Sequence, residues 1–117
     1  MDKLTNIEIG TFLKLFNRGG YVLDFTTNDF DVFTMESIGI ALCNEYHMSK
    51  GKSLAAYVNS ASTSDIEKLL NDLLSYYEEN YEQEYTENLT DDEYSYCQYN
   101  AEYARLYKKC RAYMNRV

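Results

Sequence analysis

The chain has 117 residues, of which 45% are hydrophobic and 26% charged, and its 19 acidic and 11 basic residues give a net charge of −8. This length suits one domain, 1–117, and the hydrophobic content excludes wholesale disorder. No apolar run approaches the roughly 18 residues of a transmembrane helix, so no membrane association is expected. Phosphate binding requires clustered Lys and Arg, and the acidity therefore argues against nucleic acid as the main partner.

The first ten residues and the cysteines indicate the compartment and the redox chemistry. Asp2 and Glu8 interrupt any apolar segment at the N-terminus, so no secretory signal is expected and the sequence predicts a cytoplasmic protein. Three widely spaced cysteines predict free, mostly buried thiols rather than a disulfide framework: Cys43, Cys97 and Cys110. A single histidine, His47, and the lack of a C-x-x-C pair argue against a zinc site. No constellation of residues supports catalysis, and the sequence predicts no metal, no cofactor and no catalytic residue.

Hydrophobic spacing predicts an all-α domain of five to seven helices, which the absence of proline leaves uninterrupted. The first helix spans about 6–17, because Ile9, Phe12, Leu13 and Phe16 fall on one face. Gly19 or Gly20 should then adopt a positive φ as its C-cap. The β-prone stretch 21–25 has no convincing strand to pair with.

Shorter helices follow in the middle of the chain. Thr27 and Asn28 are N-cap types that predict a helix over about 28–37. The step Ile38-Gly39-Ile40 ends it, and a short helix over 41–46, a turn over 49–52 and a helix over 53–59 come next.

A helical hairpin is predicted over 64–117, ending in a long C-terminal helix. Ser64 and Glu67 have capping-box spacing ahead of a helix expected over 65–84, and Thr90 and Glu93 repeat that spacing ahead of the last helix. The predicted core of the whole domain combines eight large side chains: Phe12, Phe16, Phe30, Phe33, Leu54, Leu70, Leu73 and Leu106.

Tyrosine is the least usual feature of the composition, with thirteen in the chain, ten of them in a tyrosine-rich region from Tyr76 to Tyr113. Tyrosine buries a ring and keeps its hydroxyl in water, so a tyrosine stripe suits either a half-exposed helix surface or a contact face. We therefore name a candidate partner-binding stripe on the last helix: Tyr96, Tyr99, Tyr103 and Tyr113. Its apolar seam continues to Val117 with no polar tail, which predicts a longer protein of which this chain is the front part.

The other local motifs give only weak indications of a binding or catalytic site. Gly51-Lys52-Ser53 resembles the end of a phosphate-binding loop, but Tyr46 stands where that motif requires glycine. A weaker prediction is an anion site formed by Lys50 and Lys52 with the amides that open the helix near Ser53. Asp29 and Asp31 lack the preceding buried strand of an aspartyl phosphotransferase, so we interpret them as acids in the first turn of a helix.

One segment, residues 12–58, resembles a known family. It reads F-L-K-L-F over 12–16, R-G-G-Y-V-L-D-F over 18–25, Phe30 and Phe33, I-G-I over 38–40, and S-K-G-K-S-L over 49–54. This order of hydrophobic residues and turns resembles the small N-terminal domains of AbiJ-type bacterial abortive-infection (antiphage) proteins. The resemblance implies a non-enzymatic sensing, adaptor or assembly domain, placed ahead of a separate effector module. Residues after 76 lie outside it.

The favoured hypothesis is therefore a protein-interaction domain of an antiphage protein, binding a protein partner or a downstream effector domain, with homo-oligomerisation left open. An alternative from another class is a small phage-encoded inhibitor that mimics nucleic-acid charge, motivated by the acidic run 78–93. A second alternative is a small DNA-binding regulator, which the net charge disfavours.

Overall fold

The computed structural model describes residues 3–19, 21–85 and 101–117. These residues form an all-α globule, as the hydrophobic spacing predicts, with one two-stranded ribbon. Its elements, in chain order, are α1 Asn6–Phe16, β1 Asn17–Arg18, β2 Tyr21–Val22, α2 Thr27–Ile38, α3 Leu42–Tyr46, α4 Lys50–Ser60, α5 Thr63–Asn80, α6 Glu82–Tyr85 and α8 Ala101–Arg116.

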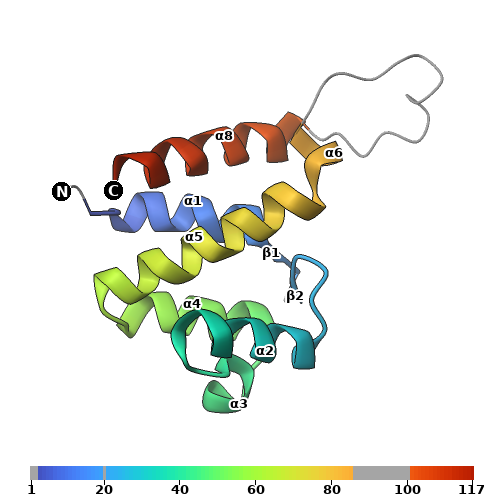
Figure 1. Ribbon diagram of the computed structural model, residues 1–117, viewed down its shortest axis with the longest axis vertical. Helices are drawn as coiled ribbons and strands as arrows, with labels where there is room; N and C mark the ends of the chain where they lie inside the picture. Colours follow the sequence, from blue (N-terminus) through green and yellow to red (C-terminus); the bar gives the residue numbers. More distant parts are fainter. Residues whose placement is uncertain (1–2, 20, 86–100) are drawn as a thin grey trace.

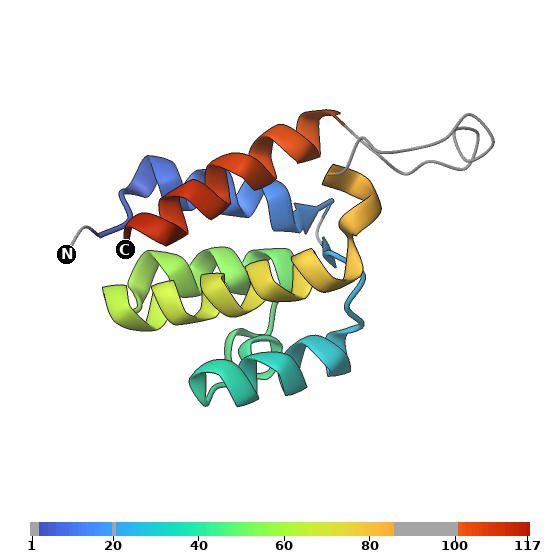
Figure 2. The same ribbon diagram turned by 45° about the horizontal axis from the view of Figure 1, so that its top comes forward.

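The helices stack in three layers (Figures 1 and 2). α1 and α8 lie side by side in one outer layer, α4 and α5 form the middle layer, and α2 and α3 form the other outer layer. The start of α1 and the end of α8 lie at the same side of the molecule, where Arg116 Nη1 donates to Glu8 Oε2 at 2.6 Å. α8 contacts α5, the other helix of the predicted hairpin, and it also lies along α1.

The core is centred on α5, whose stripe of apolar residues is covered by the layers on both sides. Leu69, Leu70, Leu73, Leu74 and Tyr77 are fully buried. Seven of the eight predicted core residues are buried, but Phe33 is only half-buried. Phe33 differs because it faces the gap between α2 and α5, where solvent reaches part of its ring.

The prediction that 21–25 has no strand partner is wrong. Asn17 pairs with Val22, and Arg18 pairs with Tyr21, in a tight antiparallel ribbon. The positive φ predicted for the glycine pair is confirmed at Gly19, at 66°, although Gly19 lies in the turn of this ribbon and Asn17 is the C-cap of α1. The ribbon forms because φ > 0 is available to glycine without a steric cost, so the chain can reverse within two residues.

Several helix starts differ from the predicted ones because a neighbouring residue provides the cap. α4 begins at Lys50, inside the expected turn, because Ser49 Oγ accepts the amide of Lys52 at 3.3 Å. α5 begins at Thr63 because Ser62, and not Ser64, accepts the amide of Asp65. The Thr90 capping box lies outside the described residues.

The α2–α3 pair is held by side chains from α2 that cap α3. Asp31 accepts the amides of Cys43 and Asn44 at 2.7 and 3.2 Å, and Thr34 Oγ1 accepts the amide of Leu42 at 3.2 Å. Asp29 lies in the first turn of α2, as predicted, but the same prediction is wrong for Asp31, which lies beyond that turn. Asp31 therefore satisfies backbone donors of the next helix, a role that its own position in the sequence does not reveal.

Cys43 and Cys110 are buried and form no disulfide within the described parts of the chain, and Cys97 lies outside them. Burial raises the pKa of the Cys110 thiol to about 12. Of the helices described, none has the length and hydropathy to cross a bilayer.

Truncating Leu70 should cost much more stability than truncating an exposed residue of similar size. Leu70 is fully buried on α5, so Leu70→Ala should lower the free energy of unfolding by about 2–5 kcal/mol. Ile7 is 84% exposed, so Ile7→Ala should change it by less than about 0.5 kcal/mol. Urea denaturation followed by circular dichroism measures both, and equal losses would contradict the described core.

The two glycines Gly19 and Gly10 should respond in opposite directions to alanine. Gly19 has a positive φ, so Gly19→Ala should destabilise the chain by about 1 kcal/mol. Gly10 lies within α1 with open space around its Cα, so Gly10→Ala should stabilise it by about 0.5–1 kcal/mol. Thermal melting of both variants tests this, and a stabilised Gly19→Ala would contradict the ribbon turn.

Candidate functional site

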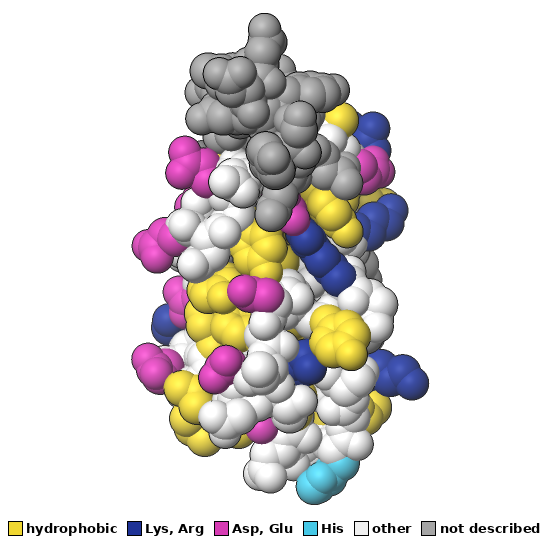
Figure 3. Space-filling model, turned by 90° about the vertical axis from the view of Figure 1, so that its right-hand side faces the viewer, with side chains coloured by type: hydrophobic (Ala, Val, Ile, Leu, Met, Phe, Trp, Pro, Cys, Tyr) yellow, Lys and Arg dark blue, Asp and Glu magenta, His cyan; other side chains and the backbone are white. Residues whose placement is uncertain are grey.

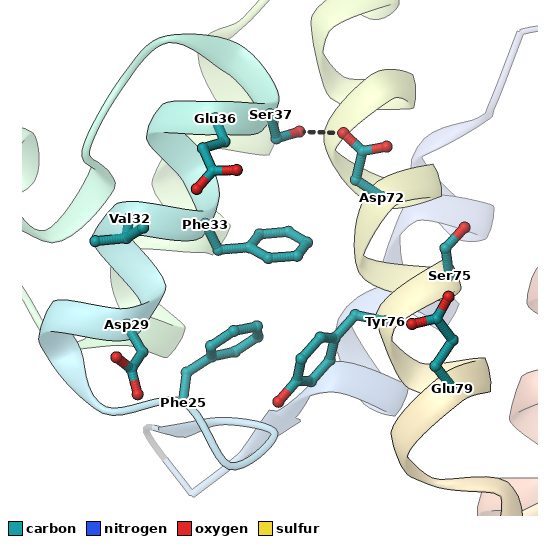
Figure 4. Close-up of a pocket in the computed structure, with 10 residues that line it drawn as sticks. All are labelled: Phe25, Asp29, Val32, Phe33, Glu36, Ser37, Asp72, Ser75, Tyr76 and Glu79. Atoms are coloured by element: carbon teal, nitrogen blue, oxygen red, sulfur yellow. Dashed lines mark hydrogen bonds between the residues drawn. The ribbon is translucent and has the colours of Figure 1, made fainter.

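A groove between α2 and α5 is the candidate site, and we call it the α2–α5 groove (Figure 4). Its volume is about 520 Å³, within the range of ligand-binding clefts. Aromatic side chains form its floor and carboxylates stand along its rims. The lining residues are Phe25, Asp29, Val32, Phe33, Glu36, Ser37, Asp72, Ser75, Tyr76 and Glu79.

The two walls carry the same residue pattern. On α2, Asp29, Val32, Phe33 and Glu36 fall at positions i, i+3, i+4 and i+7. On α5, Asp72, Ser75, Tyr76 and Glu79 occupy the same four positions. This spacing places the four residues of each set on one face of their helix. The helices run in opposite directions, so Glu36 lies near the Asp72 end and Asp29 lies near the other end (Figure 4).

Three rings pack together to form the floor. The rings of Phe25 and Tyr76 stack with centroids 4.5 Å apart, and the Phe33 ring meets Tyr76 edge-on at 5.8 Å. Tyr76 Oη donates to Asp24 Oδ1 at 2.8 Å. Burial, together with this hydrogen bond to a carboxylate, raises the pKa of Tyr76 to about 12. The floor is therefore a neutral, preorganised aromatic surface at physiological pH.

The rims are acidic. Asp29, Glu36 and Glu79 are exposed, and none of the three forms an ion pair within the described residues. Asp72 is already engaged, because Ser37 Oγ donates to it at 2.6 Å and Lys68 Nζ lies 2.7 Å from it. In the space-filling view, acidic side chains border apolar ones on the left of the face shown (Figure 3).

Aromatic faces beside carboxylates favour one kind of ligand group. A ring face is electronegative and attracts a cation within about 6 Å, and carboxylates add charge-assisted hydrogen bonds. The groove is thus suited to an ammonium or guanidinium group carried on an apolar stem.

The predicted tyrosine stripe is only partly described, and its described members contact this chain's own core. Tyr96 and Tyr99 lie outside the described residues. Tyr103 and Tyr113 are half-buried, and the Arg18 guanidinium lies 3.9 Å from the centroid of the Tyr103 ring. Their use by a partner stays a prediction.

The predicted anion site has Lys50 and Lys52 in different environments. Lys50 is buried, with its Nζ 4.7 Å from the centroid of the exposed Tyr21 ring. Lys52 is exposed, and its amide is bonded to the capping Ser49. The anion site also stays a prediction.

A second polar feature, the Arg18 cluster, joins the ribbon to the C-terminal half of the chain. Arg18 donates to both oxygens of Glu84 at 2.7 and 2.8 Å, and Tyr77 Oη donates to Glu84 Oε1 at 3.0 Å. Burial acts to lower the pKa of Arg18, but Glu84 outweighs it and raises that pKa. Every charged atom of the cluster is matched inside the fold, so the cluster is structural.

The groove was missed in the sequence, although a signal for it was present. The sequence predicts Phe33 as a core residue and Asp29 as an acid in a first helical turn, and it places Tyr76 in the tyrosine-rich region. Only a comparison of the two helices reveals the shared pattern of acid, small or branched residue, aromatic and acid at i, i+3, i+4 and i+7. These helices are not neighbours in the chain.

No family model, curated protein or solved structure matches the chain. The resemblance of residues 12–58 to AbiJ-type N-terminal domains therefore stays a prediction. Among the described residues, no group of three or more His, Cys, Asp or Glu is placed to hold a metal ion.

Replacing Glu78 should remove an acid-sensitive contribution to stability. Arg111 donates to both Glu78 oxygens at 2.9 and 2.8 Å, and Tyr107 donates at 2.5 Å. Burial acts to raise the pKa of Glu78, but these hydrogen bonds outweigh it and lower that pKa. Glu78→Gln should lower the free energy of unfolding at pH 7 by about 1 kcal/mol, allowing for solvent screening.

The pH dependence of this loss follows from the lowered pKa. The native carboxylate stabilises the fold above the unfolded pKa of about 4.3, and this contribution disappears as pH falls through the lower native pKa. The difference in the free energy of unfolding between wild type and Glu78→Gln should therefore become smaller below about pH 4. Urea melts at several pH values measure it, with the exposed Glu45→Gln as control. A difference in the free energy of unfolding that stays constant down to pH 3 would contradict the Glu78–Arg111 contact.

Proposed function

We propose that this chain is a non-enzymatic protein-interaction domain, acting as an adaptor or sensor in a bacterial antiphage (abortive-infection) protein of the cytoplasm. The observation that carries the proposal is the α2–α5 groove, an open aromatic floor between acidic rims. Interfaces are enriched in aromatic residues at their centres and polar residues at their rims, which is the composition of this groove.

The groove also involves the segment on which the family resemblance rests. Phe25 and Phe33 belong to the resemblance segment 12–58, and Tyr76 completes the floor from α5. The two halves of the chain are both needed to build the groove. We therefore place the binding site of the proposed domain there, with a protein or a downstream effector domain as its partner.

The residues that line the groove favour binding over catalysis. Ser37 donates its hydroxyl hydrogen to Asp72, with no histidine among the lining residues to act as a general base. His47, the one histidine of the chain, is the C-cap of α3 and does not line the groove. Such a pair positions Asp72 and does not activate the serine.

The inhibitor alternative has less support from the described residues. It relies on the acidic run 78–93 as a mimic of nucleic-acid charge. Glu78 and Glu84, two acids of this run, are each bound to an arginine of this chain. Their charges are compensated inside the fold, which weakens the field that a basic groove on another protein would meet.

The defence role can be measured directly by phage plating. The full reading frame that encodes this chain, expressed in a bacterial host, should lower the plating efficiency of at least one phage in a broad panel by about tenfold or more. The double variant Glu36→Lys with Glu79→Lys should abolish this protection, because it reverses two exposed charges on the groove rims.

A matched control separates loss of binding from loss of charge. Glu45→Lys with Glu82→Lys makes the same change in net charge at exposed positions that do not line the groove, and it should protect fully. A reading frame that protects against no phage would contradict the defence role. Full protection by the groove variant would show that the groove is not the site.

A further inference from the structure

We infer that the α2–α5 groove binds a basic amphipathic α-helix of a partner protein. Its lysine or arginine side chains would lie two turns apart, at i and i+7, with apolar side chains between them at i+3 and i+4. This inference rests on the proposed interaction function and names the chemistry of the partner.

Charge selects a cationic partner. Asp29, Glu36 and Glu79 stand exposed on the rims, with no ion pair in the described parts of the chain. Bringing an acidic partner to them would add like-charge repulsion. A second copy of this chain carries a net charge of −8 and is disfavoured for the same reason.

Spacing selects a helix as the partner element. The two carboxylates of each wall are seven residues apart, which is two helical turns or roughly 10 Å along the axis. Cations at i and i+7 of a helix lying along the groove have the same separation. The apolar residues at i+3 and i+4 then lie over the Phe33 and Tyr76 rings, which stand midway between the acids.

Shape favours a protein surface over a small cation. The apolar area does not stop at the groove, because Val32 on its edge and Met35 on the next turn of α2 are 50% and 51% exposed. A diffusible polyamine could satisfy the carboxylates, but it would leave this surface in water. The side of a helix would cover both the groove and the adjoining surface of α2.

The test uses a designed peptide and fluorescence anisotropy. The probe is a labelled helix of about 18 residues with lysines at i and i+7, leucines at i+3 and i+4, and alanine and glutamine elsewhere. It should bind the chain with a Kd on the order of 10–100 μM. A second peptide of the same composition, shuffled so that the lysines and leucines no longer share a face, should bind at least about tenfold more weakly.

Matched protein variants locate the binding. The double variant Glu36→Lys with Glu79→Lys should raise the Kd of the probe by about tenfold or more, which is roughly 1.4 kcal/mol of binding free energy. The double variant Glu45→Lys with Glu82→Lys has the same net charge, and it should bind the probe with a Kd within about twofold of the wild-type value. Amide NMR shifts on adding the probe should fall on α2 and α5. Equal weakening by both variants, or shifts confined to other helices, would overturn the inference.

Three further outcomes are decisive. Spermine titrated alone should bind more weakly than the probe, and spermine binding in the groove as tightly would overturn the helix in favour of a diffusible polyamine. Absence of probe binding at about 1 mM would overturn the inference as well. Phage protection that depends on the groove, with no probe binding, would leave the proposed function standing and reject only this partner chemistry.

Discussion

The Arg18–Glu84 ion pair is the constraint on which the arrangement of the chain depends. Arg18 is 20% and Glu84 11% exposed at the side chain, so neither charge could be left alone without a large desolvation cost. Arg18 reaches Glu84 from the ribbon, Tyr77 adds a hydrogen bond from α5, and the ring of Tyr103 covers the guanidinium from α8. One cation thus joins the ribbon near the start of the chain to α6 and α8 in its C-terminal half.

Helices were the part of the fold that could be predicted from sequence, because burial of one face imposes a 3.6-residue period that needs no knowledge of the partner element. Helix starts were less predictable. Ser62 and Ser64 both fit an N-cap, and only the packed position of α5 decides between them. The ribbon was missed because a strand of two residues has too few positions for a pattern, and its pairing depends on the Gly19 turn.

The groove shows a different limit of sequence reasoning. The residues of each wall can be explained one at a time from their local sequence. Phe33 fits a core residue, Asp29 fits an acid in a first helical turn, and Tyr76 fits a tyrosine-rich helix. That these residues line one groove becomes clear only once α2 is known to pack on α5, a contact between segments about forty residues apart. The Arg18 cluster was hidden for the same reason, since Arg18 and Glu84 are 66 residues apart.

The repeated pattern on antiparallel walls gives the α2–α5 groove an approximate two-fold axis that passes between Phe33 and Tyr76. A helix entering from either end meets an acid from each wall, then the rings, then an acid from each wall again. The dipoles of the two walls also oppose each other, so they favour neither orientation of a bound helix. The symmetry fails at Phe25, which has no counterpart in the repeated pattern, at Val32, whose equivalent on α5 is Ser75, and at Asp72, whose charge Lys68 already shares. The orientation of a bound helix can be distinguished at these residues. A partner helix could thus be accepted in both directions, and selection between them would depend on these few side chains.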